Sequence, residues 1–326
     1  MHPGSCTDSD SLKNHLSAID RFEIILESDA SPTSREPRTV TNNSLRGMMC
    51  CLAVAMVSLS VIDRTPVVAL AGGEDKEADG HGGTLVVVGG GGTPEPVARH
   101  FVSLAGGKSA RIVVLPQASS RQDRGVSSAR MFKALGAEAL VVALEDPRQA
   151  REQIDAATAI WFPGGSQAAL YEALDKAGLV RVIQQRHAAG LVIGGTSAGA
   201  AVMSSVMIPR SPETPGLVAG NTPAIPGLGL APELIIDQHF VRRKRMNRLV
   251  GIVIDHPGRI GVGIGEATAI VVNGRRFRVM GKNSVVVIDS RGAKIGRAVR
   301  GERQSVRGLQ FHVFRDGQEF RFPKKG

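Results

Sequence analysis

The sequence contains few cysteines and few aromatic residues, and each shortage excludes a class of function. Its 326 residues include three cysteines, all of which precede residue 72. The segment that follows therefore has no disulfide, no cysteine nucleophile and no thiolate metal site. With one Trp and one Tyr, few side chains are available to stack on bases. We therefore expect no nucleic-acid partner, in spite of a formal charge of +10 that is concentrated in the last 38 residues.

The amino-terminal part has the pattern of an export leader. Residues 1–45 are polar and aperiodic, and an apolar run at 48–62 has the length of a signal-peptide core but is short for a membrane span. Ala69 and Ala71 supply a small-residue cleavage pattern, so we expect processing after about Ala71, at the end of a leader over 1–71. The mature protein would then be periplasmic or extracellular, without a stable membrane anchor. An uncleaved anchor or a buried helix is the alternative.

From Gly83 onward, short apolar runs alternate with amphipathic stretches. Such runs are typical of buried parallel strands, and the stretches between them have the length of crossover helices. This alternation predicts a doubly wound, three-layer α/β/α sandwich in a single domain over 72–326. The expected strands are 85–88, 112–115, 139–144, 159–162 and 191–193, and the expected helices lie near 94–104, 125–135, 166–177 and 180–188.

The later part of the chain has a different sequence pattern. Between Ile208 and Pro232 there are six prolines and four glycines, which predict a long loop that serves as a lid or a wall beside the site. Short β runs follow, separated by turn residues, and predict an antiparallel extension of the same domain. These runs are 260–264, 269–272, 277–280 and 285–288.

Glycines follow three predicted strands, where doubly wound sheets place their functional groups. They are Gly89–Gly92, Gly164–Gly165 and Gly194–Gly195. The first group resembles a dinucleotide-binding fingerprint, but Pro94 occupies the position of its third glycine. We therefore do not predict a nucleotide site there.

Ser197 lies in the most specific local motif, Gly195-Thr196-Ser197-Ala198-Gly199, between a predicted strand and a small-residue helix. This is the layout of a nucleophile elbow, which lifts the serine hydroxyl above the sheet. A negative oxygen formed by attack on a carbonyl needs backbone N–H donors. The amides of Ala198, directly after the serine, and Gly165 are the candidates for this oxyanion hole.

A serine nucleophile requires a base, and the base requires an orienting group. His239 is the histidine that closely follows an apolar run, and Glu266 ends the run 260–265. Both therefore fall at predicted strand ends. Asp237 is the competing orienter, and we favour Glu266 over it. This chemistry calls for no metal and no cofactor.

At these residues the sequence resembles the serine peptidase family that includes cyanophycinase and dipeptidase E, over roughly 83–288, and its cyanophycinase branch matches best. Four blocks carry the resemblance, at 162–167, 195–200, 236–240 and 263–269. The resemblance implies Ser197 as nucleophile, His239 as base and Glu266 as its orienting acid, on a flavodoxin-like fold similar to class I glutamine amidotransferases. It also implies a homodimer.

The resemblance also implies a substrate pocket and a substrate. The pocket residues would be Gln167, Asp237, Gln238, Arg243, Arg245 and Arg248. The arginines are expected on a helix that follows His239, where guanidinium groups would bind carboxylates, while Asp237 would receive a guanidinium of the substrate. The expected activity is hydrolysis of cyanophycin, an arginine-substituted poly-aspartate, to β-Asp-Arg dipeptides through an acyl-enzyme.

Some residues depart from the family pattern. Gly265 and Ala267 stand where relatives commonly have acids beside the glutamate, and Gly91–Thr93 stands where an acidic residue is usual. These departures bear on the substrate more than on the triad. Two alternatives therefore stay open: a dipeptidase for short aspartyl peptides, and a non-catalytic protein that binds a polymer.

Overall fold

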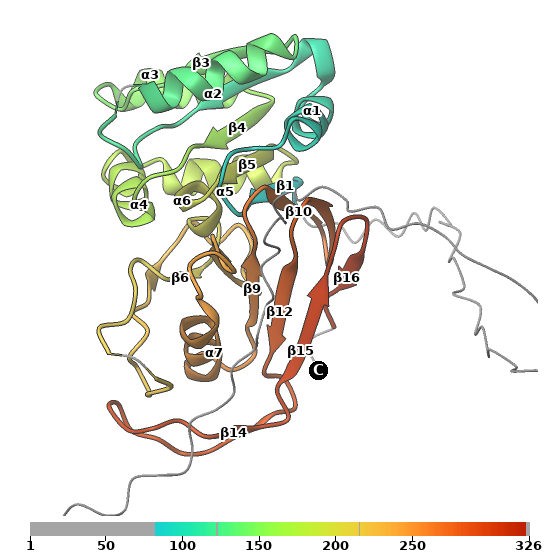
Figure 1. The fold of residues 1–326 in the computed structure, drawn as a ribbon. Coiled ribbons are helices and arrows are strands. Elements are labelled where there is room, and N and C mark those ends of the chain that lie inside the picture. Colours follow the sequence, from blue (N-terminus) through green and yellow to red (C-terminus); the bar gives the residue numbers. More distant parts are fainter. Residues whose placement is uncertain (1–81, 122, 215, 324–326) are drawn as a thin grey trace, which may run out of the picture. The chain divides into compact units, whose positions relative to one another are not determined.

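The computed structural model describes residues 82–121, 123–214 and 216–323, all within one compact unit (Figure 1). The expected leader, its apolar run and its cleavage site lie outside the described residues. Among the helices that the structure describes, none is long and apolar enough to cross a bilayer.

An eight-stranded sheet forms the centre of the fold, in the order β16-β11-β10-β1-β5-β4-β2-β3. Its five parallel strands are hydrogen bonded through four parallel pairs, and the three remaining strands extend the sheet antiparallel from β1. The parallel strands are β1 (Leu85–Val88), β2 (Arg111–Val114), β3 (Glu138–Val141), β4 (Ala159–Phe162) and β5 (Val192–Thr196), and the antiparallel strands are β10 (Thr268–Asn273), β11 (Arg276–Gly281) and β16 (Glu319–Arg321).

Helices cover both faces of this sheet, so its inner strands are buried on both sides. On one face, α1 (Glu95–Leu104) and α2 (Asp123–Ala134) pack through Phe101 and Phe132 against Trp161. The apolar residues of α3 (Pro147–Ala156), α4 (Gln167–Lys176), α5 (Val180–Ala188) and α6 (Ala198–Ala201) belong to the core of the other face. The predicted α/β/α sandwich is therefore confirmed.

A second, four-stranded sheet has the order β15-β12-β9-β8. Its strands are β8 (Leu234–Gln238), β9 (Ile260–Ile264), β12 (Val285–Asp289) and β15 (Gln310–Phe314), and α7 (Met246–Asp255) packs on it. The short strand pairs are β6 (Val206–Met207) with β7 (Ile225–Pro226), and β13 (Lys294–Ile295) with β14 (Val306–Arg307). β8 and β9 are parallel, so their carboxyl ends lie side by side.

Two sequence expectations need correction here. The carboxyl-terminal strands do pair antiparallel with one another, but they divide between the two sheets instead of forming one extension: β10 and β11 extend the main sheet, whereas β9 and β12 join β8, to which β9 is parallel. The arginines after His239 do not share a helix either, because α7 begins at Met246 and includes only Arg248. Arg242 and Arg243 lie in the turn that precedes it, and Arg245 is its N-cap residue.

Candidate active site

Ser197 stands at the turn between β5 and α6, with the backbone φ of 55° that a sharp elbow requires. Its amide donates a hydrogen bond to the carbonyl of Val88 on the neighbouring strand (3.0 Å). The flanking glycines are sterically required: a Cβ at Gly195 would lie 2.5 Å from the carbonyl oxygen of Gly199, and one at Gly199 would collide with Phe162. The sequence therefore forms the elbow where the motif predicts it.

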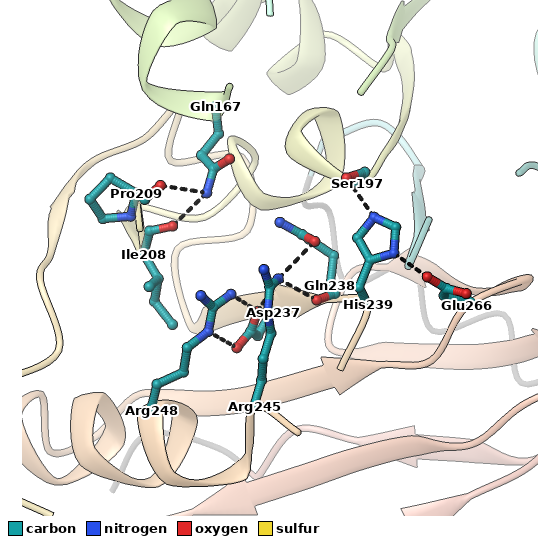
Figure 2. A network of polar contacts seen from close by, with 10 residues as sticks. All are labelled: Gln167, Ser197, Ile208, Pro209, Asp237, Gln238, His239, Arg245, Arg248 and Glu266. Carbon is teal, nitrogen blue, oxygen red and sulfur yellow. Dashed lines mark hydrogen bonds and ion pairs between the residues drawn. The ribbon is translucent and has the colours of Figure 1, made fainter. Parts of the chain in front are cut away.

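His239 and Glu266 come from the ends of β8 and β9 and meet Ser197 there (Figure 2). The Ser197 hydroxyl lies 2.9 Å from His239 Nε2, and His239 Nδ1 lies 2.6 Å from Glu266 Oε1. With its proton on Nδ1, the imidazole donates to the carboxylate and accepts from the serine. The three residues thus form one hydrogen-bonded chain, as a nucleophile, its base and an orienting acid require.

The surroundings set the charge of this chain. Burial lowers the pKa of His239 below its usual 6.5, and the hydrogen bond to Glu266 only partly opposes that shift. The same hydrogen bond lowers the pKa of Glu266, with a smaller effect from Arg242, whose Nη1 lies 3.5 Å from Oε2. At neutral pH the imidazole is therefore neutral and the carboxylate ionised, which is the state that general-base catalysis needs.

The Ala198 and Gly165 amides are expected to form an oxyanion hole. Ala198 directly follows the serine, and Gly165 lies shortly after the end of β4. Within the described part of the chain, neither the Ala198 nor the Gly165 N–H donates to another protein group. Gly165 has a φ of 153°, and a Cβ there would overlap the carbonyl of Ala118. The glycine allows the chain to turn at this point, and Gly165 lines the cavity beside Ser197.

A cavity of about 800 Å³ opens beside Ser197 and His239. The proline-rich segment contributes Pro209, Arg210 and Ser211 to its lining, so the predicted loop does form a wall of the site. α2 contributes Met131. No sequence pattern predicted that α2 would contribute to this cavity.

Arg243, Arg245 and Arg248 line the same cavity, as the family resemblance implies. The Arg243 side chain is exposed, and no acidic partner lies within ion-pair distance among the residues that the structure describes. Burial is the main cause that lowers the pKa of Arg245, to about 10, so it remains charged at neutral pH. The cavity is therefore cationic.

Asp237 does not have the predicted position. It is 1% exposed and does not line the cavity. Arg248 binds it with two hydrogen bonds, through Nε to Oδ2 (2.7 Å) and through Nη2 to Oδ1, and Arg245 Nη1 lies 3.3 Å from Oδ1 (Figure 2). Both carboxylate oxygens are used inside the protein. The expectation that Asp237 receives a guanidinium of the substrate is therefore wrong. Asp237 instead binds the guanidinium groups of Arg245 and Arg248.

Gln238 and Gln167 line the cavity but also hold its walls. Gln238 accepts hydrogen bonds from Arg245 Nη1 through its backbone and side-chain oxygens, at 2.6 Å and 2.9 Å. Gln167 Nε2 donates to the carbonyls of Ile208 and Pro209, at 2.5 Å and 3.4 Å. No group in the described part of the chain is hydrogen bonded to the amide nitrogen of Gln238 or to the oxygen of Gln167, so these two atoms are left for a ligand.

Among the described residues, no group of three or more His, Cys, Asp or Glu side chains is arranged to hold a metal ion. The arrangement that is present can carry out acyl transfer: a serine elbow, a base with its acid, and two backbone amides beside them. These features on an α/β sandwich define a serine-type peptidase.

Comparison with known proteins gives the same class. The sequence profile of Peptidase family S51 matches residues 85–280. The cyanophycinase of Trichormus variabilis is 34% identical over 276 residues, which cover 79% of this chain and 85% of that protein. The cyanophycinase of Geminocystis herdmanii is 33% identical, with coverage of 79% and 93%.

A solved structure shares the fold. The crystal structure of a peptidase from an acI-B1 Actinobacterium aligns with a TM-score of 0.57 at 22% identity, over 74% of this chain and 98% of that one. The chain therefore belongs to peptidase family S51. It is a cyanophycinase-like serine-type peptidase of that family.

Proposed function

We propose that this peptidase hydrolyses cyanophycin, multi-L-arginyl-poly-L-aspartate, as an exopeptidase that releases β-Asp-Arg dipeptides. One observation carries the proposal: the Ser197–His239–Glu266 chain opens onto a cavity lined by four arginines, Arg210, Arg243, Arg245 and Arg248. Each β-Asp-Arg product carries free carboxylates, which guanidinium groups bind well. The relatives named as cyanophycinases support the same substrate.

In the proposed mechanism, Ser197 is the nucleophile. Its proton passes to His239 Nε2 while Oγ attacks the scissile carbonyl carbon, and Glu266 stabilises the imidazolium that forms. The amides of Gly165 and Ala198 donate to the resulting oxyanion. The imidazolium then gives its proton to the leaving amine, and the acyl-enzyme on Ser197 remains. Water, deprotonated by His239, releases the acid and restores the serine.

Arg243 is the group we assign to direct contact with a substrate carboxylate. It lines the cavity, and no acidic side chain of the described chain lies within ion-pair distance. Arg245 and Arg248 are held by Asp237, and two guanidinium groups against one carboxylate leave a positive charge in excess. This excess favours an anionic ligand, and Gln167 and Gln238 supply neutral hydrogen bonds beside it.

The test is release of β-Asp-Arg from purified cyanophycin by residues 72–326, beside Ser197→Ala. The parent should release the dipeptide, and the variant should be slower by about a millionfold, as when a working triad is broken. Cleavage of α-aspartyl dipeptides with cyanophycin left intact would instead identify a dipeptidase. No cleavage of either substrate would refute the proposal.

We also propose that the protein is exported and works as a homodimer. The apolar run at 48–62 and the small residues Ala69 and Ala71 motivate export, and the family resemblance motivates the dimer. Amino-terminal sequencing of the protein from its native cells should begin near Gly72. Light scattering should give twice the chain mass. A cell-internal protein with an intact amino terminus, or a monomer, would refute the respective proposal.

A further inference from the structure

The glycine turn at Gly89–Gly92, between β1 and α1, lies directly against the catalytic chain. Resting on the proposed roles of Ser197, His239 and Glu266, we propose that Gly90 and Gly91 are positioning residues for that chain. Their missing side chains leave the space that the imidazole and the carboxylate occupy, and the backbone around them fixes all three catalytic residues relative to one another.

Three successive carbonyls of this segment bind the backbone at the catalytic residues. The carbonyl of Val88 accepts from the amide of Ser197 at 3.0 Å, and that of Gly89 accepts from the amide of His239 at 2.7 Å. The carbonyl of Gly90 accepts from the amide of Ala267, the residue after Glu266, at 2.8 Å. One short segment thus contacts the backbone at the ends of β5, β8 and β9, which belong to two different sheets.

Gly90 and Gly91 are also in steric contact with the side chains of His239 and Glu266. A Cβ at Gly90 would lie 2.5 Å from His239 Nε2, the atom that accepts from Ser197, and still closer to Cε1. A Cβ at Gly91 would lie 2.7 Å from Glu266 Cβ and 3.0 Å from its Cγ. Carbon atoms do not approach so closely, so a methyl group at either position must displace the side chain it meets. Positions 90 and 91 therefore act on the base and the acid respectively.

Two other glycines, Gly92 and Gly136, distinguish this role from a requirement of the turn geometry alone. Gly90, Gly91 and Gly92 all have positive φ, of 95°, 69° and 93°, so alanine strains the backbone at each of them. A Cβ at Gly92 would meet no atom within 4 Å. Gly136, between α2 and β3, combines a φ of 87° with the same open space, away from the site. If the glycines served only the turn, these substitutions would have equal effects.

The experiment compares Gly90→Ala, Gly91→Ala, Gly92→Ala and Gly136→Ala. Two readouts are the rate at which a small fluorophosphonate labels Ser197, which does not depend on the identity of the peptide substrate, and kcat and KM on cyanophycin. Gly90→Ala should lower the labelling rate and kcat by about a hundredfold, the usual effect of an ångström of misplacement, and should change KM little. Gly91→Ala should shift the pH profile of labelling, because it moves the group that orients the imidazole.

Gly136→Ala should keep the parental labelling rate and kcat. Gly92→Ala should lower these two rates by less than about tenfold, since backbone strain alone leaves the imidazole in place. Equal losses in Gly90→Ala, Gly91→Ala and Gly92→Ala would overturn the proposal. A parent that fails to label at Ser197 would refute the proposed function instead, which is a distinct result.

A double substitution keeps the test valid if Gly90→Ala folds poorly. His239→Ala removes the imidazole and leaves room for a methyl group at position 90. Gly90→Ala should therefore lower the thermal midpoint of the parent more than that of His239→Ala. The same drop in both backgrounds would show that Gly90 does not act through His239 and would contradict the proposal.

Discussion

At the scale of single residues, the site has unusual backbone conformations. Among the described non-glycine residues, those with positive φ are Ser197, His239, Lys244 and Ala267. Two of them belong to the proposed triad, and Ala267 follows Glu266. Each such conformation costs about 1–3 kcal/mol and persists only where the surroundings hold it. Here the carbonyls of Val88, Gly89 and Gly90 do so.

The pH dependence of activity should reflect the burial of His239. Only the neutral imidazole accepts the serine proton, so kcat/KM falls as pH drops through the pKa of this group. Because burial lowers that pKa, the acid midpoint of kcat/KM should lie below 6.5. Glu266→Gln removes a cause that raises the pKa, so it should lower both the rate and the midpoint. A parental midpoint at or above 6.5 would contradict this account.

Asp237 should affect stability more than substrate binding. Asp237→Asn leaves two largely buried arginines without their counter-charge, and breaking such a pair costs about 3–5 kcal/mol. Urea unfolding should show this loss. Asp175→Asn, at an exposed position, is the matched control and should stay within about 0.5 kcal/mol of the parent. Unchanged stability together with a raised KM would instead place Asp237 in contact with the substrate.

At the scale of elements, α4 holds the proline-rich wall of the cavity through Gln167. Gln167→Ala removes hydrogen bonds to the carbonyls of Ile208 and Pro209. Loss of a neutral hydrogen bond costs about 1 kcal/mol, so KM should rise about fivefold, with faster hydrogen exchange over 208–211. Gln184→Ala is the control, because its amide binds the carbonyl of Leu228 at the other end of the segment (2.9 Å). An equal rise of KM in both variants would show that the effect is not local.

The strands were predictable from sequence because burial leaves a strong local pattern. β1 (Leu85–Val88) and β4 (Ala159–Phe162) are short apolar runs buried at every residue. The sequence of α3 has a weaker burial pattern, since only Ala150 and Ile154 of its ten residues are buried. Its start is marked by Asp146, whose carboxylate accepts from the amides of Arg148 and Gln149. The helix escaped prediction because its apolar face consists of only these two buried residues.

The site was predictable to the extent that it follows from strand ends. Ser197, His239 and Glu266 each follow an apolar run, and the carboxyl ends of the parallel pair β8 and β9 place His239 beside Glu266. The approach of Ser197 from the other sheet depends on how the two sheets pack. The pairing of Asp237 with Arg245 and Arg248, and the contact of Gly90 with His239, depend on how distant segments pack. No local pattern encodes such contacts, so these features required the structure.

At the scale of the whole molecule, stability should fall on mild acidification. Burial lowers the pKa of His187, His239 and His256 below 6.5. The unfolded chain then binds more protons than the folded one, and stability is lost as pH falls from 6.5 through the folded-state values. The thermal midpoint should therefore decrease between pH 7 and pH 5, above the range in which ordinary carboxylates titrate. A constant midpoint over this interval would contradict the prediction.

The most direct test of the central claim is to locate the covalent bond that the site can form. Residues 72–326 are incubated with a fluorophosphonate, and the adduct is mapped by peptide mass spectrometry. The account predicts one phosphonyl group per chain, on Ser197, with labelling slowed by roughly a hundredfold or more in His239→Ala because the general base is lost. An adduct on another residue, or cleavage of cyanophycin that persists in Ser197→Ala, would contradict it.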